Sequence, residues 1–157
     1  VMPNTPALIQ SGVSGLFAAA CVKQADRDSA QSILGAVGGV VWVQSESHID
    51  AVTAISGSGP AYVFYFIEAL EQAALELGLT ARQALELAVQ TFVGAAKLAA
   101  GSDEPVAVLR ARVTSTAGTT EAALKTMEAN GVKRKIVEAV HAAARRSREL
   151  GDEFGKD

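Results

Sequence analysis

The pattern of apolar and polar positions divides the chain into a short mixed segment and a long helical one. Residues 12–18 and 39–43 are rich in β-branched and aromatic side chains, which predicts two strands. Residues 26–37 have a helical pattern that starts at an aspartate and stops at Gly38. Strand, helix and strand form the unit of a parallel sheet, and two strands alone make no stable layer. We therefore expect residues 1–44 to belong to a parallel sheet with further strands upstream.

From residue 45 onward the pattern becomes almost entirely helical. It predicts helices at residues 50–55, 60–77, 80–100, 121–129 and 132–150, and a shorter helix that starts after residues 101–105 and ends at Arg112. Thr80 and Gln83 have the spacing of a capping box, and we expect the tail after residue 150 to fray. The predicted fold class is mainly α, with a helical domain at residues 45–157.

The helix at residues 60–77 is apolar on every side in its first half. Residues 61–67 are consecutively apolar, whereas a surface helix needs only one apolar stripe. The next helix is rich in alanine and glycine, which allow close helix approach. Together they predict an interlocked homodimer whose core is shared between chains; the alternative is a monomeric bundle with one central helix.

Composition narrows the classes of partner. The chain of 157 residues has a net charge of -3 and a pI near 5.4, which argues against nucleic acid or an anionic membrane as partner. No apolar run reaches the roughly 18 residues that span a bilayer. Cys21 is the single cysteine, so no intrachain disulfide forms, and we expect a buried thiol in a reducing compartment, the cytoplasm. The two histidines lack neighbours at ligand spacing, so no metal site is expected.

The segment at residues 113–121, VTSTAGTTE, carries the most chemical information. It combines five hydroxyl groups with a glycine where a helix begins. The first turn of a helix leaves N–H groups unpaired at the positive end of its dipole, so the segment predicts a pocket for a small anion such as a carboxylate. The alternative is a hydroxyl-rich cap between two helices. The Gly57-Ser58-Gly59 turn lacks the third glycine of a dinucleotide fingerprint and is interpreted as a helix start.

Four motifs occur in the order found in one enzyme family. They are MPNTPA at residues 2–7, DAVTAISGSGPAY at 50–62, GAAK at 94–97, and L-x3-VTS-x2-GTT at 109–120. Over essentially its whole length the chain resembles pyrroline-5-carboxylate reductase. The resemblance implies NAD(P)H-dependent reduction of 1-pyrroline-5-carboxylate to L-proline in proline biosynthesis. It also implies a C-terminal portion: residues 1–44 would end a Rossmann-type α/β domain with its last β-α-β piece, and residues 45–157 would form a helical dimerisation and substrate-binding domain. The start at Val1 agrees with this expectation of a fragment, inactive by itself.

The resemblance also implies roles for individual residues. Thr120 matches the catalytic threonine whose hydroxyl reaches the ring nitrogen of the substrate. The implied substrate-binding residues are Glu46, Ser115, Gly118, Thr119 and Thr120. The implied cofactor-binding residues are Met2, Pro3, Asn4, Thr5 and Arg112, where the family usually has glutamine or asparagine in place of Arg112. The implied cofactor is NADPH or NADH, and the implied assembly is a homodimer or a ring of dimers.

One departure affects the substrate turn. The family usually has Ser-Pro-Gly-Gly-Thr-Thr, whereas this chain has Ser-Thr-Ala-Gly-Thr-Thr at residues 115–120. Loss of a proline and a glycine predicts a looser turn or a change in its φ and ψ, because glycine tolerates positive φ and alanine does not. The departure leaves open a second reading, a non-catalytic helical dimerisation or ligand-binding module derived from such an enzyme.

Overall fold

The chain contains two compact units, one with a small sheet and helices and the other made of helices. A computed structural model describes residues 1–155. One unit comprises Val1–Tyr62 and the chain from Val137 onward, and the other comprises Val63–Ile136. These units follow contacts between segments, so the expected functional boundary after residue 44 stays a prediction.

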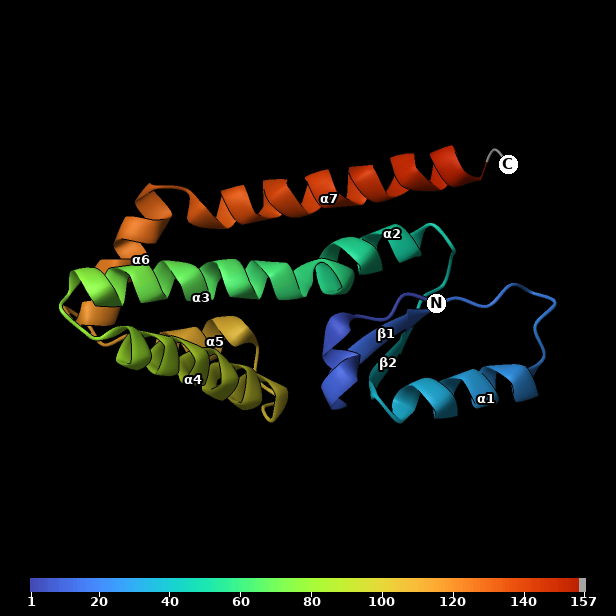
Figure 1. Cartoon of the computed structure of the whole chain (residues 1–157), viewed down its shortest axis with the longest axis horizontal. Helices are drawn as coiled ribbons and strands as arrows, with labels where there is room; N and C mark the ends of the chain where they lie inside the picture. The colour runs from blue at the N-terminus through green and yellow to red at the C-terminus, as the bar shows by residue number, and fades with distance from the viewer. Residues whose placement is uncertain (156–157) are drawn as a thin grey trace. The chain divides into compact units, whose positions relative to one another are not determined.

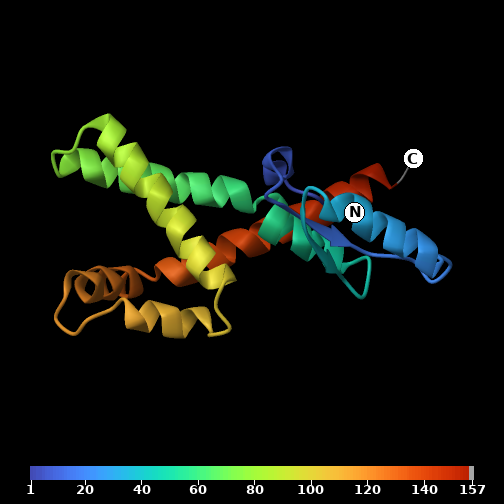
Figure 2. The same ribbon diagram turned by 90° about the horizontal axis from the view of Figure 1, so that it is seen from below.

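A small parallel sheet organises the first unit. Strands β1 (Gly12–Leu16) and β2 (Gly38–Trp42) pair in parallel, with Gly12 opposite Gly38 and Leu16 opposite Trp42. Helix α1 (Gln24–Gly35) connects the strands and lies beside them in both ribbon views (Figures 1 and 2). The predicted strand, helix and strand are confirmed, with strands somewhat shorter than the apolar runs.

The N-terminal residues add to β1 on its other side. Met2 forms an antiparallel bridge with Gly15, through N–H···O bonds of 2.8 and 2.9 Å. The 3-10 helix η1 (Thr5–Ile9) follows and contacts β1. Met2 thus lies against the sheet through backbone pairing, and η1, which has Pro6 in its first turn, contacts the same strand.

A π-helical turn interrupts the next helical stretch. Helix α2 (His48–Val52) runs directly into η2 (Thr53–Gly57), and α3 (Gly59–Glu76) follows. The Ser58 N–H donates to the Thr53 carbonyl over 2.8 Å, the i→i+5 bond of a π-turn. The expected break at residues 56–59 is therefore a widened turn within helix, and not a loop.

Close approach of α2 to the sheet requires a glycine. A Cβ placed on Gly15 would overlap the two methyl groups of Val52. Because Gly15 has no side chain, the backbone of β1 can lie directly against the Val52 side chain of α2. This contact fixes the place where α2 crosses the strand.

Helices make up the second unit. Helix α4 (Ala81–Ala100) begins with the predicted capping box of Thr80 and Gln83, and α5 (Val106–Arg112) and α6 (Thr119–Ala129) follow. Gly78, at a φ of 92°, turns the chain from α3 to α4. The ring centroids of Phe66 in α3 and Phe92 in α4 lie 6.4 Å apart. Helix α7 (Val132–Phe154) begins in this unit and continues into the first. The expected fraying after residue 150 is wrong as far as Phe154, because α7 continues through it.

Buried side chains are few for so helical a chain. Within the described residues the buried set consists of Ser14, Leu16, Ala54, Ala84 and Ala88. Large apolar side chains on α3 are exposed instead: Phe64 to 61% and Tyr65 to 72%. Cys21 is exposed too, so the expected burial of its thiol is wrong; it lies in the turn before α1, outside any layer.

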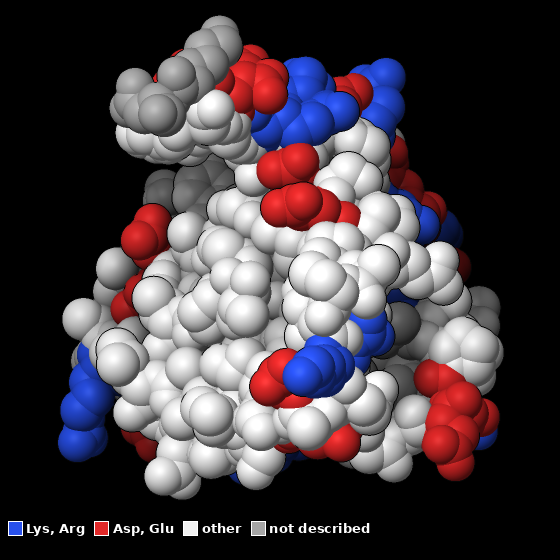
Figure 3. All heavy atoms as spheres, turned by 90° about the vertical axis from the view of Figure 1, so that its right-hand side faces the viewer, with Lys and Arg blue, Asp and Glu red and all other residues white. Residues whose placement is uncertain are grey.

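The C-terminal part of α7 carries a charged surface, visible at the top of Figure 3. Arg146 contacts Glu149 at 3.1 Å and Glu153 at 2.9 Å. The hydrogen bonds that Arg146 donates to the Glu153 carboxylate and then to the Glu149 carboxylate raise the pKa of its guanidinium above the ordinary value. The other side of α7 is held by Ser147, whose hydroxyl donates to Asp50 Oδ1 of α2 over 2.6 Å.

Candidate functional site

The hydroxyl-rich segment forms a tight turn before α6. The Gly118 N–H donates to the Ser115 carbonyl over 3.0 Å, which closes a four-residue turn. Ala117 has a φ of 59°, the left-handed conformation that glycine favours. Despite the departure from the family pattern, alanine therefore takes the strained left-handed conformation itself.

The turn delivers the chain into α6 with its first N–H groups free. Gly118 is the N-cap residue, and no side chain caps the helix. Within residues 1–155 no group accepts a hydrogen bond from the N–H of Thr119, Thr120 or Glu121. The Glu121 carboxylate instead accepts from the Ala117 N–H over 2.6 Å and pairs with Lys125 at 3.0 Å. The helix start thus presents three free donors at its positive end, the arrangement that binds a carboxylate.

Hydroxyl groups surround these donors. Thr120 is half-buried and Thr119 is exposed, and in the described part of the chain neither hydroxyl has a hydrogen-bond partner. Ser115 Oγ lies so close to Gly118 that a Cβ at that glycine would overlap it. A side chain at Gly118 would therefore displace the Ser115 hydroxyl from its place in the turn.

Arg112 is held at the end of α5 by an acidic partner. Its Nη2 donates to Glu104 Oε1 over 2.7 Å, and its Nη1 lies 2.5 Å from Oε2. This two-point pair joins the last residue of the short helix to a residue just before its start. Glu104 was missed by sequence reasoning, although an acidic residue before and a basic residue at the end of a seven-residue helix are a detectable signal.

The Met2–Thr5 loop lies in the first unit. Pro3 and Thr5 are exposed, whereas Met2 and Asn4 are half-buried. The Asn4 amide bonds to protein on both sides: it accepts from the Val13 N–H over 2.9 Å and donates to the Ser56 carbonyl over 3.1 Å. Pro3 and Thr5 are thus the loop residues free to face a ligand.

Glu46 occupies the turn between β2 and α2. Its carbonyl accepts from the Ile49 N–H over 2.9 Å, while its side chain is exposed. Among residues 1–155 its carboxylate has no hydrogen bond or ion pair. The structure therefore gathers Ser115, Gly118, Thr119, Thr120 and Arg112 in one unit, and Glu46 with the Met2–Thr5 loop in the other.

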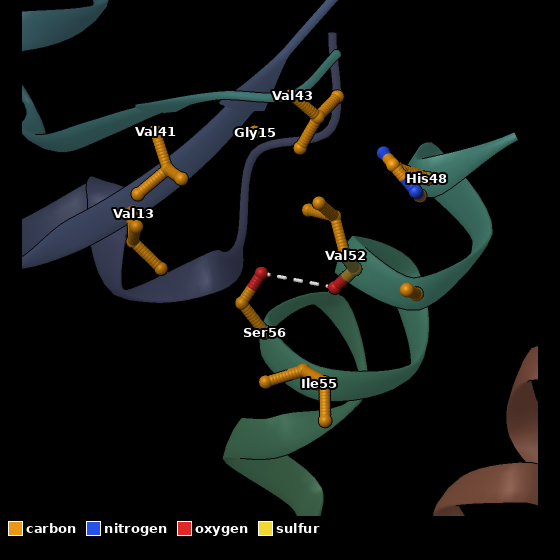
Figure 4. Close-up of a pocket in the computed structure, with 9 residues that line it drawn as sticks. Val13, Gly15, Val41, Val43, His48, Val52, Ile55 and Ser56 are labelled. Carbon is orange, nitrogen blue, oxygen red and sulfur yellow. Dashed lines mark hydrogen bonds between the residues drawn. The ribbon is translucent and has the colours of Figure 1, made fainter. Parts of the chain in front are cut away.

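A separate apolar pocket of about 480 Å³ opens between the sheet and α2 (Figure 4). Its lining residues are Val13, Gly15, Val41, Val43, His48, Ala51, Val52, Ile55 and Ser56. The Ser56 hydroxyl already donates to the Val52 carbonyl over 3.0 Å, as the dashed line shows. The pocket therefore offers an anion almost no polar partner, and the α6 start remains the candidate carboxylate site.

Neither a metal-binding cluster nor a membrane-spanning helix occurs in the described residues. Residues 1–155 contain no group of three or more histidine, cysteine, aspartate or glutamate side chains arranged to hold a metal ion. Over the same range, none of the helices has the length and apolar character needed to cross a membrane.

Comparison with known proteins assigns the chain to a family. The pyrroline-5-carboxylate reductase dimerisation family matches residues 46–150. Pyrroline-5-carboxylate reductase of Pseudomonas aeruginosa is 48% identical over 155 residues, covering 99% of this chain and 57% of that protein. The Haemophilus influenzae enzyme is 43% identical over 96% of this chain and 56% of its own length.

Solved structures agree with these relatives. The pyrroline-5-carboxylate reductase of Coxiella burnetii aligns with a TM-score of 0.92 at 46% identity, covering 95% of this chain and 55% of that one. The Plasmodium falciparum pyrroline carboxylate reductase, solved with NADP bound, aligns with a TM-score of 0.88 at 35% identity, covering 96% and 61%. The chain thus spans a little over half the length of the relatives it matches.

The resemblance inferred from four motifs and the mainly α fold class are both confirmed: the chain belongs to the pyrroline-5-carboxylate reductase dimerisation family.

Proposed function

We propose that this chain provides the substrate-binding turn and the dimer interface of an enzyme that reduces 1-pyrroline-5-carboxylate to L-proline with NADPH or NADH. The observation that carries the proposal is the start of α6, where the N–H groups of Thr119, Thr120 and Glu121 have no acceptor within residues 1–155. The relatives, which carry the name of this activity, support it.

The substrate carboxylate binds the free N–H groups at the α6 start. Three donors and the helix dipole stabilise a negative charge there. The Ser115 hydroxyl, beside Gly118, supplies a further donor at the same turn. Anchoring the carboxylate fixes the imine ring, and orientation of two reactants is the main contribution expected of the protein.

Thr120 acts on the ring nitrogen. Reduction adds a hydride to the imine carbon and a proton to the nitrogen, and a bound NADPH or NADH supplies the hydride. A threonine hydroxyl is a poor acid, so Thr120 positions and polarises the C=N bond by hydrogen bonding. We assign Glu46, exposed and without a partner in the described range, to hold the water that delivers the proton.

The chain's residues fit only one end of the cofactor. Pro3 and Thr5 offer an apolar ring and a hydroxyl, which suit the uncharged nicotinamide end. The resemblance also assigns Arg112 to the cofactor, but the Arg112 guanidinium is bonded to Glu104. No phosphate cradle is assigned to these residues.

Exposed apolar side chains support a homodimer. Phe64 and Tyr65 of α3 are 61% and 72% exposed, in a helix whose first half is apolar on every side. Apolar surface of this kind marks an interaction site. Two copies would have a mass of about 32 kDa, twice the 16.2 kDa of one chain, which sedimentation equilibrium measures directly. Phe64→Glu should produce the monomer.

We place the enzyme in the cytoplasm, where the lone Cys21 stays reduced.

The function is tested by following NADPH or NADH oxidation with 1-pyrroline-5-carboxylate in the full-length enzyme that contains this chain. Thr120→Ala should lower kcat about a hundredfold, within the range expected for a group that acts in the transition state. Thr126→Ala is the matched control, since that hydroxyl only donates to the Ala122 carbonyl inside α6. Near-normal turnover of Thr120→Ala would remove Thr120 from the mechanism. A dimer without reductase activity would favour the second reading, a non-catalytic dimerisation or ligand-binding module.

A further inference from the structure

The Asn4 side chain joins three segments of the first unit. Its Oδ1 accepts from the Val13 N–H of β1 over 2.9 Å, and its Nδ2 donates to the Ser56 carbonyl over 3.1 Å. Ser56 lies 52 residues further along the chain, and both bonds are partly buried. One amide thus ties the Met2–Thr5 loop to a strand and to η2.

The Asn4 amide donates to a carbonyl of the π-helical turn η2, which is an unusual element. A π-turn has one residue more than an α-turn, and such turns occur frequently at functional sites. Carbonyls in η2 bond to side chains: the Asn4 amide donates to Ser56, and the Tyr62 hydroxyl donates to Ala54 over 3.1 Å. These side chains hold the turn in its widened form.

Packing at the same junction is close. A Cβ placed on Gly57 would lie 2.5 Å from Met2 Cε, while the Met2 backbone pairs with Gly15. The loop therefore contacts η2 twice, through the Asn4 amide and through the Met2 side chain. Movement of η2 would be transmitted to the loop.

We propose that Asn4 is a positioning residue, which fixes the Met2–Thr5 loop on the π-turn η2, and not a cofactor ligand. The role of the loop beside the nicotinamide rests on the proposed function; the junction itself does not. Both ends of the Asn4 amide are already bonded to backbone, so the side chain is directed into the protein. Asn4 acts through Pro3 and Thr5, the loop residues that are exposed.

Substitution by aspartate gives a signature specific to this geometry. In Asn4→Asp the carboxylate can still accept from the Val13 N–H, but it cannot donate to Ser56 when ionised. When protonated it makes both bonds, so the Ser56 carbonyl should raise the pKa of the introduced carboxyl above the ordinary value of about 3.9. A raised folded-state pKa gives stability that is present at low pH and is lost as the pH rises through that pKa.

The first measurement is therefore the melting temperature of wild type, Asn4→Asp and Asn4→Ala between pH 4 and 7.5. We expect the deficit of Asn4→Asp relative to wild type to shrink steadily as the pH falls, while that of Asn4→Ala stays constant. A deficit of Asn4→Asp that does not change with pH, or no deficit, would overturn the assignment. This readout needs no reductase activity, so it stands even where the proposed function fails.

The second measurement separates positioning from simple loss of stability. Because small misplacement of reacting groups can lower rates about a hundredfold, Asn4→Ala should lower kcat tenfold or more. Gln31→Ala is the control: it removes the 2.6 Å bond from the Trp42 indole N–H, in the same unit but outside the loop. Its kcat should stay within twofold of wild type. Equal kcat losses in the two variants, measured in the full-length enzyme that contains this chain, would contradict the positioning role. A wild-type full-length enzyme without reductase activity would count against the proposed function instead.

Discussion

Replacement of Ala117 by glycine should stabilise the protein, although most alanine-to-glycine changes destabilise. Ala117 has a φ of 59°, and its side chain is exposed. A non-glycine residue in this left-handed conformation costs roughly 1–2 kcal/mol. Glycine removes that cost but gives the unfolded chain more freedom, which opposes folding by about 0.4–1 kcal/mol.

The balance of the two effects is a gain of about 0.8 kcal/mol in the free energy of unfolding, taken from the middle of each range. For a chain of this size that is a rise of about 2–3 °C in melting temperature. The assay is thermal unfolding by circular dichroism at one fixed protein concentration.

The matched control is Ala123→Gly, at an exposed position inside α6. There the φ is helical, so glycine should lower stability by about 1 kcal/mol. The two substitutions are chemically identical and should have effects of opposite sign. A fall in melting temperature for Ala117→Gly similar to that of the control would refute the left-handed conformation of the turn.

Three further substitutions test contacts described above. Gly15→Ala should destabilise by about 1–3 kcal/mol, because its Cβ overlaps Val52, and denaturant unfolding measures this directly. Ser147→Ala should lower the free energy of unfolding by about 1.5 kcal/mol, because it removes a partly buried hydrogen bond to a carboxylate of α2. Arg146→Ala, on the exposed side of α7, should change the unfolding midpoint less, and the reverse order would contradict the docking of α7. Glu121→Ala should cost about 1 kcal/mol by freeing the N–H of residue 117, and a chemical shift of that N–H unchanged by the substitution would show that the bond is absent.

Much of the fold could be predicted from the order of residue types. The β-branched runs predicted both strands and the Thr80–Gln83 box predicted the start of α4, because these signals act over a few neighbouring residues. Cys21 was misjudged because its apolar neighbours in sequence say nothing about the turn in which it lies. Burial depends on which segments meet, and local pattern does not contain that information.

The site was predictable in the same uneven way. The hydroxyl content of residues 115–120 indicated free donors at a helix start, a local property. The partners of Asn4 and Arg112 were not predicted, because each bond joins residues whose separation has no periodic signature. Ala117 shows the converse: a propensity rule predicted that alanine would avoid positive φ, but the closing bond of the turn and the carboxylate of Glu121 hold it there.

The scarcity of buried side chains has a consequence for how the protein behaves on dilution. Among residues 1–155 the buried apolar side chains are Leu16 and three alanines, while phenylalanine and tyrosine are exposed on α3, so one copy has little to hold it folded by itself. In the proposed dimer, folding and association become one equilibrium, so the melting temperature rises with protein concentration. Substitutions on the α3 surface then act as core substitutions do, and their severity depends on how much of the protein a cell makes.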